Sequence, residues 1–484
     1  MARTKYFLKA DLSEDIFPSM CWGGYALFLG YSIVLNPKLG VIISILPMLI
    51  WFIVSDKINI LYLLLALMPF NQVPFLNENL LNIPGAKPFN LLSFVALLAC
   101  FYHGGQLLYN SGTIKRKVMI FLAIYFAFYS LATFRSLNYH SLLYMLDSSY
   151  QSSIGRYLLS YYIVPSLYLV SFLYILNHVT TEKDIKKITT FLCAIAGMLS
   201  ITIIFLSIYK GHTYMMGRHA QNELMQTNFG LHYNTLGVFY IILGPLLIIP
   251  VIDKHFWGIL NWCLAGVAII FLGSRTAMIV FLFGTISMLY FLGKKKELIV
   301  LLAILTLFSL YFLPGYLLRT LQIGFESGDV DDIFTGRIDS IWLPLLWEWV
   351  NNPKLLFLGK GKYSMMTSSV YLKGIVLQTR TAHNAYVGFF LDNGIILFSG
   401  LIFYIIKFLG FAWQNVKRIN SHIAWAFLMS IICYLIAAIT GRKIYPSEQN
   451  MLLLPIIALL INYLNLHKAF ASKNVEIEKE AMRQ

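Results

Sequence analysis

The stretch from residue 256 to residue 296 decides the class of fold: FWGILNWCLAGVAIIFL, then GSR, then TAMIVFLFGTISMLYFLG, then KKK. Each apolar run is nearly long enough to cross a bilayer as a helix, which takes about 20 residues. Similar runs recur along all 484 residues, of which 58% are hydrophobic and 12% charged. With a mean hydropathy of +0.70, this is not the composition of a soluble protein. The sequence predicts an all-α polytopic membrane protein.

The polar breaks between apolar runs predict about 12–14 transmembrane helices. Fourteen candidate spans fall near residues 21–36, 38–54, 58–70, 89–107, 118–134, 157–177, 188–208, 234–251, 256–272, 276–293, 297–314, 395–411, 423–440 and 449–466. We expect N-terminal spans over 1–208, a membrane core over 209–316 with an external loop at 209–233, a large external loop over 317–394, C-terminal spans over 395–466 and a tail over 467–484.

The basic residues predict the orientation in the membrane. If the spans alternate, short basic clusters such as Lys115-Arg116-Lys117 and Lys294-Lys295-Lys296 fall on one side. Cytoplasmic loops carry such an excess, so both termini are predicted to be cytoplasmic. Arg275 and the two external loops then share the opposite face, which is periplasmic in a Gram-negative cell. The formal charge of +15 follows this pattern and does not indicate a nucleic-acid partner.

Two arginines on the external face are candidates for binding an anionic ligand. Arg275 opens a span directly after Gly273-Ser274, and an arginine at membrane depth is costly unless it is paired or faces water. Arg337 follows Gly336 and precedes a run with helical apolar spacing and two tryptophans, which predicts a helix lying in the membrane interface. A guanidinium can donate two hydrogen bonds to a diphosphate. An interfacial anchor and a solvated loop are the respective alternatives.

The segment Arg380-Thr381-Ala382-His383-Asn384 introduces a second helical stretch, Ala385 to Asp392. Asn393-Gly394 interrupts it, which predicts a half-helix and a turn before the next span. His383 titrates near neutral pH and can take a proton from a hydroxyl. A nearby charge on Arg380 would keep it neutral. A helix-capping or headgroup-facing histidine is the alternative.

In this order, these residues resemble the O-antigen ligase and polymerase superfamily. The resemblance runs from about Arg218 to Gly394. It includes LHYNTLG at 231–237, SRT at 274–276, GR at 336–337 ahead of a Trp-bearing helix, LGKG at 358–361 and HN at 383–384. Members of this superfamily move a glycan from a polyprenyl-diphosphate carrier to an acceptor at the outer face of the bacterial inner membrane. The resemblance implies a GT-C-like membrane enzyme.

The resemblance also implies roles for individual residues. Arg275 and Arg337 would bind the diphosphate of an undecaprenyl-diphosphate-linked glycan and offset the charge that builds up as the glycosidic bond breaks. His383 would act as general base on the acceptor hydroxyl, and an in-line attack would invert the anomeric configuration. Further binding candidates for the same pocket are Arg218, Arg380, Arg442, Asn234, Tyr233 and Asn384.

No cofactor or metal is expected, because diphosphate is already a good leaving group and the arginines can supply the electrostatic stabilisation. Asp329-Val330-Asp331 matches the DxD pattern with which many glycosyltransferases hold a divalent metal. Its glycine- and acid-rich surroundings favour an exposed connector instead. The five cysteines lie in or beside apolar runs without metal-binding spacing.

Three activities stay open on the sequence alone. A polymerase would transfer the growing chain to a lipid-linked repeat unit, a ligase would transfer it to lipid A-core, and the higher span count favours the polymerase. A flippase or transporter for the same lipid-linked glycan would more often bury charges midway along its spans and show an internal repeat. Membrane lipid and other proteins of polysaccharide assembly are the further candidate partners.

Overall fold

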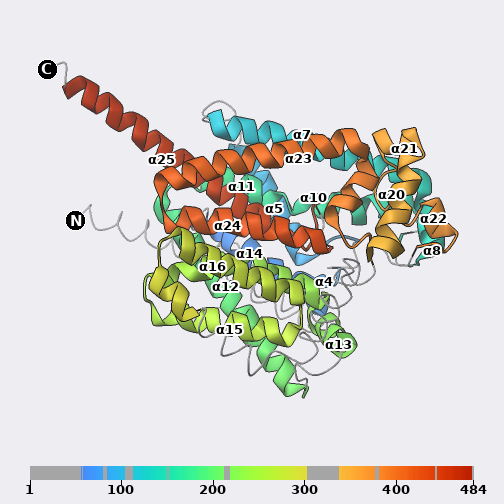
Figure 1. Ribbon diagram of the computed structural model, residues 1–484, viewed down its shortest axis with the longest axis horizontal. Coiled ribbons are helices and arrows are strands. Elements are labelled where there is room, and N and C mark those ends of the chain that lie inside the picture. Colours follow the sequence, from blue (N-terminus) through green and yellow to red (C-terminus); the bar gives the residue numbers. More distant parts are fainter. Residues whose placement is uncertain are drawn as a thin grey trace, which may run out of the picture. The chain divides into compact units, whose positions relative to one another are not determined.

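The computed structural model describes Asp56 and residues 58–79, 84–103, 113–148, 150–151, 153–211, 218–301, 337–376, 381–441 and 444–481. The chain divides into two units, Met1–Ile60 and Leu61–Gln484, and the helix packing and the candidate site described below lie in the second unit. Every regular element among the described residues is a helix (Figure 1), which confirms the all-α prediction.

The main helices of the first half are α5 (Pro88–His103), α7 (Thr113–Ser136), α9 (Ile154–Leu158), α10 (Val164–Leu167), α11 (Val170–His178), α12 (Glu182–Tyr209), α13 (Arg218–Phe229) and α14 (Tyr233–Ile252). Those of the second half are α15 (Phe256–Leu272), α16 (Arg275–Phe291), α20 (Leu343–Val350), α21 (Pro353–Leu358), α22 (Ser369–Leu372), α23 (Ala385–Ile419), α24 (His422–Ala437) and α25 (Leu453–Ala481).

Several helical segments are apolar enough to lie in a membrane. Six are also long enough to cross it: Val118–Leu146, Ile154–His178, Glu182–Tyr209, Tyr233–Ile252, Ala385–Ile419 and His422–Thr440. Five shorter ones are Asn59–Phe70, Pro88–Cys100, Phe256–Leu272, Arg275–Phe291 and Leu453–His467. Each overlaps a span predicted from the sequence, which supports an integral membrane protein. The predicted spans at 21–36 and 38–54, and most of 297–314, lie outside the described residues.

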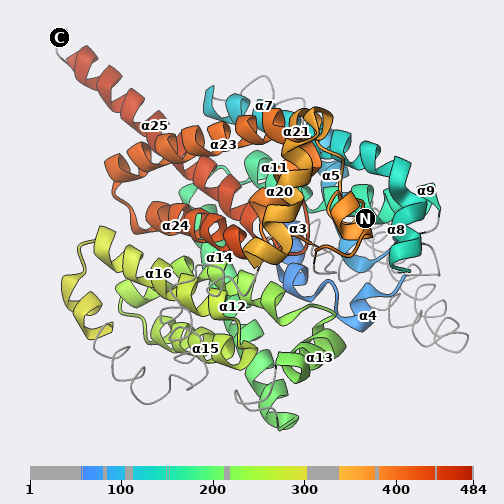
Figure 2. The same cartoon turned by 45° about the vertical axis from the view of Figure 1, so that its right-hand side comes forward.

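The buried helix α14 is the centre of one group of helices. It packs against α12, α15, α16 and α24 (Figures 1 and 2). Glycines allow α16 to approach closely: a Cβ added at Gly237 would lie 2.9 Å from the Cβ of Ala277, and one added at Gly244 would lie 2.7 Å from the ring of Phe281. Small residues at such contacts are typical of packing between membrane helices.

Helix α23 is interrupted at Gly394, where φ is 77° and ψ is 175°. The interruption confirms the predicted half-helix over residues 385–392 and the turn before the span. The turn at residues 358–361 packs into this interruption, and the backbone N–H of Gly361 donates to the carbonyl of Asp392 at 3.0 Å. The LGKG motif at 358–361 and Asn393-Gly394 therefore pack against each other at the interruption of α23.

The segment after Arg337 is helical, as predicted. One π-helical turn, Ile338–Trp342, continues directly into α20. Trp349 on this helix is fully buried, whereas Trp347 is 63% exposed on another face. The helix is therefore amphipathic, and its placement in the membrane interface stays a prediction. The first part of the predicted 317–394 loop, up to residue 336, lies outside the described residues.

Candidate functional site

His383 lies in a turn directly before α23, and its backbone φ is 52°. Few non-glycine residues adopt this left-handed conformation, although histidine and asparagine are enriched among them. Such backbone outliers cluster at functional sites, which supports His383 as a candidate. The following residue, Asn384, caps α23 by accepting hydrogen bonds from the backbone N–H groups of Tyr386 (2.9 Å) and Val387 (3.2 Å).

Two neighbouring segments hold the His383 turn in place. The indole Nε1 of Trp342 donates to the carbonyl of Ala382 at 2.6 Å, which ties the turn to the helical segment after Arg337. From another part of the chain, Gly441 approaches so closely that an added Cβ would lie 3.2 Å from the Cα of His383. The turn is thus packed between the segment after Arg337 and the end of the α24 region.

The pKa of His383 is lowered from 6.5 to about 4, first by burial, then by the positive charge of Arg337, and then by His232. The imidazole is therefore neutral at physiological pH and can accept a proton at one ring nitrogen. The sequence predicted this neutral state through Arg380. That residue lies outside the described part of the chain, and burial together with Arg337 and His232 provides the effect.

The starts of α14 and α16 lie side by side. The hydroxyl of Ser274 donates to the side-chain oxygen of Asn234 at 2.8 Å, and the next residue, Arg275, is the first of α16. His232 caps α14, since its Nδ1 accepts from the backbone N–H of Asn234 at 3.1 Å. Asn234 and Ser274 are 40 positions apart in the sequence. Their hydrogen bond therefore brings the LHYNTLG motif at the start of α14 and the SRT motif at the start of α16 together at one end of the two helices.

His383 belongs to the neighbourhood of this contact. His232 caps α14 and acts electrostatically on His383, as Arg337 does. The rings of His232 and Tyr233 are 4.3 Å apart. The structure therefore gathers most of the sequence-predicted site residues around the starts of α14, α16 and α23: Tyr233, Asn234, Arg275, Arg337, His383 and Asn384.

The remaining predicted arginines are described to different extents. Arg218 is the first residue of α13. One turn later, the side-chain oxygen of Gln221 would lie 2.4 Å from a Cβ added at Gly273, so α13 begins beside the start of α16. Arg380 and Arg442 lie outside the described residues, and their roles stay predictions.

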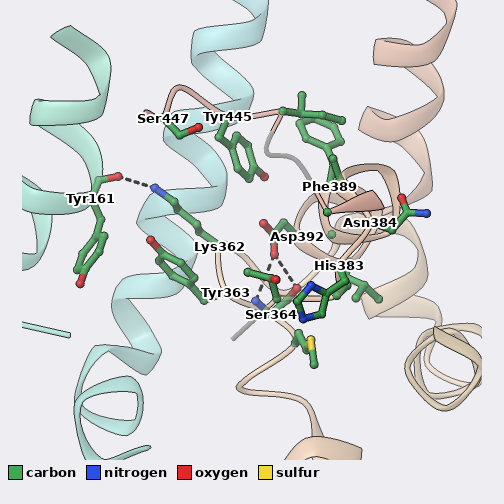
Figure 3. A pocket seen from close by; sticks show the side chains of 18 of the residues that line it. Tyr161, Lys362, Tyr363, Ser364, His383, Asn384, Phe389, Asp392, Tyr445 and Ser447 are labelled. Atoms are coloured by element: carbon green, nitrogen blue, oxygen red, sulfur yellow. Dashed lines mark hydrogen bonds between the residues drawn. The ribbon is translucent and has the colours of Figure 1, made fainter. Parts of the chain in front are cut away.

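A cavity of about 200 Å³ lies beside His383 (Figure 3). It is formed by the first turns of α23, the segment 362–365, the helix around Tyr161 and the loop after α24. His383 and Asn384 are the sequence-predicted residues that line it; among the described lining residues there is no arginine. Sequence reasoning missed a set of polar lining residues: Tyr161, Lys362, Ser364, Asp392, Tyr445, Ser447 and Glu448.

Lys362 and Asp392 are buried titratable groups in this missed set. The Lys362 ammonium is 2.6 Å from the carbonyl oxygen of Tyr161, to which it donates, and 4.8 Å from the ring centre of Tyr129. The Asp392 carboxylate accepts from the backbone N–H of Ser364 at 3.2 Å and from its hydroxyl at 2.6 Å. Buried charges need such partners. The signal that could have found them is an aspartate within an otherwise apolar half-helix.

One comparison with known families covers most of this neighbourhood. Residues 260–402 match the family model described as O-antigen ligase. This match supports the O-antigen ligase and polymerase superfamily. The matched region contains Arg275, Arg337 and His383, and it ends within α23, beyond the interruption at Gly394. A search among curated proteins finds no match.

This partial match supports membrane glycosyl transfer of the O-antigen ligase or polymerase type. In general, the substrates of this family are a lipid-linked glycan and lipid A-core. The multiple apolar helices fit an integral membrane protein with this activity.

Proposed function

We propose that the chain is an inverting, metal-independent glycosyltransferase. It moves a polyprenyl-diphosphate-linked glycan en bloc to an acceptor hydroxyl on the periplasmic face of the bacterial inner membrane. The observation that carries the proposal is a neutral, half-buried imidazole, His383, under the influence of the positive charge of Arg337. This pairing combines a proton acceptor with a group that can bind diphosphate.

The reaction follows from these two groups. The acceptor oxygen attacks the anomeric carbon while the bond between that carbon and the diphosphate oxygen breaks. The hydroxyl proton passes to a ring nitrogen of His383, and the departing diphosphate keeps the bonding electron pair and gains one negative charge. Arg275 and Arg337 offset this charge, which stabilises the transition state more than the ground state. Attack opposite the leaving group inverts the anomeric configuration.

Binding of the donor would also change the pKa of His383. With a pKa of about 4, His383 is a weak base in the donor-free protein. A diphosphate bound at Arg337 would cancel much of the positive charge that lowers this pKa, so the pKa would rise. General-base catalysis is most efficient when the pKa lies near the working pH. Burial, the largest cause of the lowering, remains, so the rise would be partial, and His383 would be a stronger base with the donor bound than without it.

The periplasmic position rests on charge. Arg275 begins α16, and Lys294-Lys295-Lys296 follows the other end of that helix. The positive-inside rule puts the lysine cluster, and with it both termini, in the cytoplasm. The candidate site then faces the periplasm. Its location at helix starts, rather than midway along spans, favours chemistry over a flippase or transporter.

Within the superfamily we favour the polymerase over the ligase, because the predicted span count lies above the twelve expected of a ligase. A strain deleted for this gene separates them when its surface polysaccharide is resolved on a gel. Single repeat units attached to lipid A-core would identify a polymerase. Bare core with long chains accumulating on the carrier would identify a ligase. Unchanged surface polysaccharide would contradict both.

A further inference from the structure

The cavity beside His383 differs in chemistry from the arginine cluster. Its described lining carries one buried cation, Lys362, and two carboxylates, Asp392 and Glu448. Neither Arg275 nor Arg337 is among the described residues that line it. A diphosphate would meet two acidic groups and a single lysine, which does not favour an anionic ligand.

The polar groups of this cavity are held in fixed positions. Lys362 donates to the carbonyl of Tyr161 at 2.6 Å, and its ammonium lies 5.4 Å from the ring centre of Tyr363. Ser364 donates to Asp392 at 2.6 Å. Glu448 accepts from the hydroxyl of Tyr168, a buried residue directly after α10, at 3.3 Å. These contacts already hold the lining side chains in place, so less side-chain entropy is lost when a ligand binds.

Aromatic rings complete the lining. Tyr161 and Tyr363 meet edge to face with ring centres 5.6 Å apart, and Phe389 and Tyr445 lie 5.3 Å apart. Figure 3 shows Tyr161, Tyr363, Phe389 and Tyr445 among the side chains around the cavity, with His383 beside them. Tyrosine rings offer both an apolar face and a polar hydroxyl.

We propose that this cavity binds one sugar ring of the glycan acceptor and presents a hydroxyl of that ring to His383. The proposal rests on the proposed function. It assigns the two substrates to different sides of His383: the donor diphosphate to Arg275 and Arg337, and the acceptor sugar to the cavity lined by Lys362, Asp392 and Tyr445.

The lining fits a sugar better than a diphosphate. A sugar ring has apolar C–H faces and a rim of hydroxyls that both donate and accept hydrogen bonds. The cavity supplies acceptors on Asp392 and Glu448, a donor on Lys362, and hydroxyls that do both. Its volume of about 200 Å³ is below the roughly 300–1,000 Å³ of typical ligand pockets, which suits a single ring.

Gly388 allows a test that leaves every lining side chain in place. It lies on α23 one turn after Asn384 and one turn before Asp392, and all three line the cavity. A Cβ added at Gly388 would meet no atom within 4 Å. Gly388→Leu should therefore fill the cavity without disturbing the fold. Gly400→Leu is the matched control, since Gly400 lies on the same helix, also meets no atom within 4 Å, and does not line the cavity.

The readout is saturation-transfer NMR of the full-length protein in deuterated detergent, with methyl glycosides of glucose, galactose and N-acetylglucosamine as probes. We expect the wild type and Gly400→Leu to saturate at least one glycoside. We expect Gly388→Leu to raise the Kd for that glycoside, from titration of the signal, by about tenfold or more, which corresponds to about 1.4 kcal/mol. Equal signals for the two leucine variants, or no glycoside signal with the wild type, would overturn the proposal.

A second arm distinguishes the acceptor sugar from the donor sugar. Undecaprenyl-diphosphate-linked N-acetylglucosamine is added to the wild type with the bound glycoside. Retention of the glycoside signal supports an acceptor subsite, whereas its displacement would assign the cavity to the donor and overturn the acceptor assignment. Glycoside binding needs no turnover. If His383→Asn stays active, the proposed function fails whatever the glycosides do; if Gly388→Leu binds and transfers normally, only the cavity proposal fails.

Discussion

Gly359 and Gly394 each pack against the backbone just before the other, at the interruption of α23. A Cβ added at Gly359 would lie 2.4 Å from the backbone of Asp392, and one added at Gly394 would lie 2.4 Å from the backbone of Phe357. Both glycines also have positive φ, 69° and 77°. The two motifs that contain them therefore form one crossing, which fixes the half-helix that begins after His383.

This crossing predicts that Gly394→Ala destabilises the protein. The methyl group meets backbone, which cannot move aside easily, and the combination of φ 77° with ψ 175°, which is essentially restricted to glycine, adds roughly 1–3 kcal/mol. We expect a loss of about 2 kcal/mol or more, together with a loss of transfer activity, measured by thermal unfolding in detergent and by polysaccharide gels. Gly400→Ala on the same helix should be neutral or slightly stabilising. Equal melting temperatures for the two variants would refute the crossing.

A second prediction concerns the charge of Arg337. Removing this positive charge favours the protonated imidazole, so Arg337→Gln should raise the pKa of His383 from about 4 towards 6.5. Burial, the largest cause of the lowering, remains, and the rise should be incomplete. Histidine-selective ¹³C labelling with pH titration measures this, and the spectrum of His383→Asn assigns the resonance. Lys354→Gln, at an exposed lysine in α21, is the control and should leave the pKa unchanged. If the pKa of His383 does not rise in Arg337→Gln, the charge of Arg337 does not act on His383.

A third prediction concerns Lys362, whose positive charge acts on the buried Asp392 carboxylate. Lys362→Met removes this charge together with the hydrogen bond to the carbonyl of Tyr161, and we expect a loss of about 1–2 kcal/mol in unfolding free energy. Lys362→Met combined with Asp392→Asn should recover part of the loss, because it also removes the buried acidic group on which Lys362 acts. Lys354→Met, at an exposed lysine, should have little effect. Additive losses in the double variant would show that the two groups act independently.

Much of the fold could be predicted from the sequence because the bilayer imposes one simple demand, about 20 apolar residues for each span. The positions where helices begin could also be predicted. Ser274 and Asn384 are residue types that favour the position before a helix, and Gly394 follows an asparagine where a helix is interrupted. The predicted half-helix and its end were correct for this local reason.

The cavity could not be predicted in the same way, because it depends on contacts between distant segments. The backbone N–H of Lys362 donates to the carbonyl of Ala132 at 2.8 Å, and its ammonium reaches Tyr161. Nothing local in the sequence joins the end of α7, the helix around Tyr161 and the loop at Tyr445. Asp392 was the one local signal, since a carboxylate in an apolar helix requires partners.

The replacement His383→Asn tests the central claim most directly. Asparagine also tolerates the left-handed backbone that His383 adopts, so the turn is preserved while the base is removed. The measurement compares transfer from an undecaprenyl-diphosphate-linked glycan, and binding of undecaprenyl diphosphate, for the purified wild type and the variant. We predict that transfer falls by about 10²–10⁴-fold while carrier binding is unchanged. Transfer at the wild-type rate would contradict the assignment of His383 as the general base.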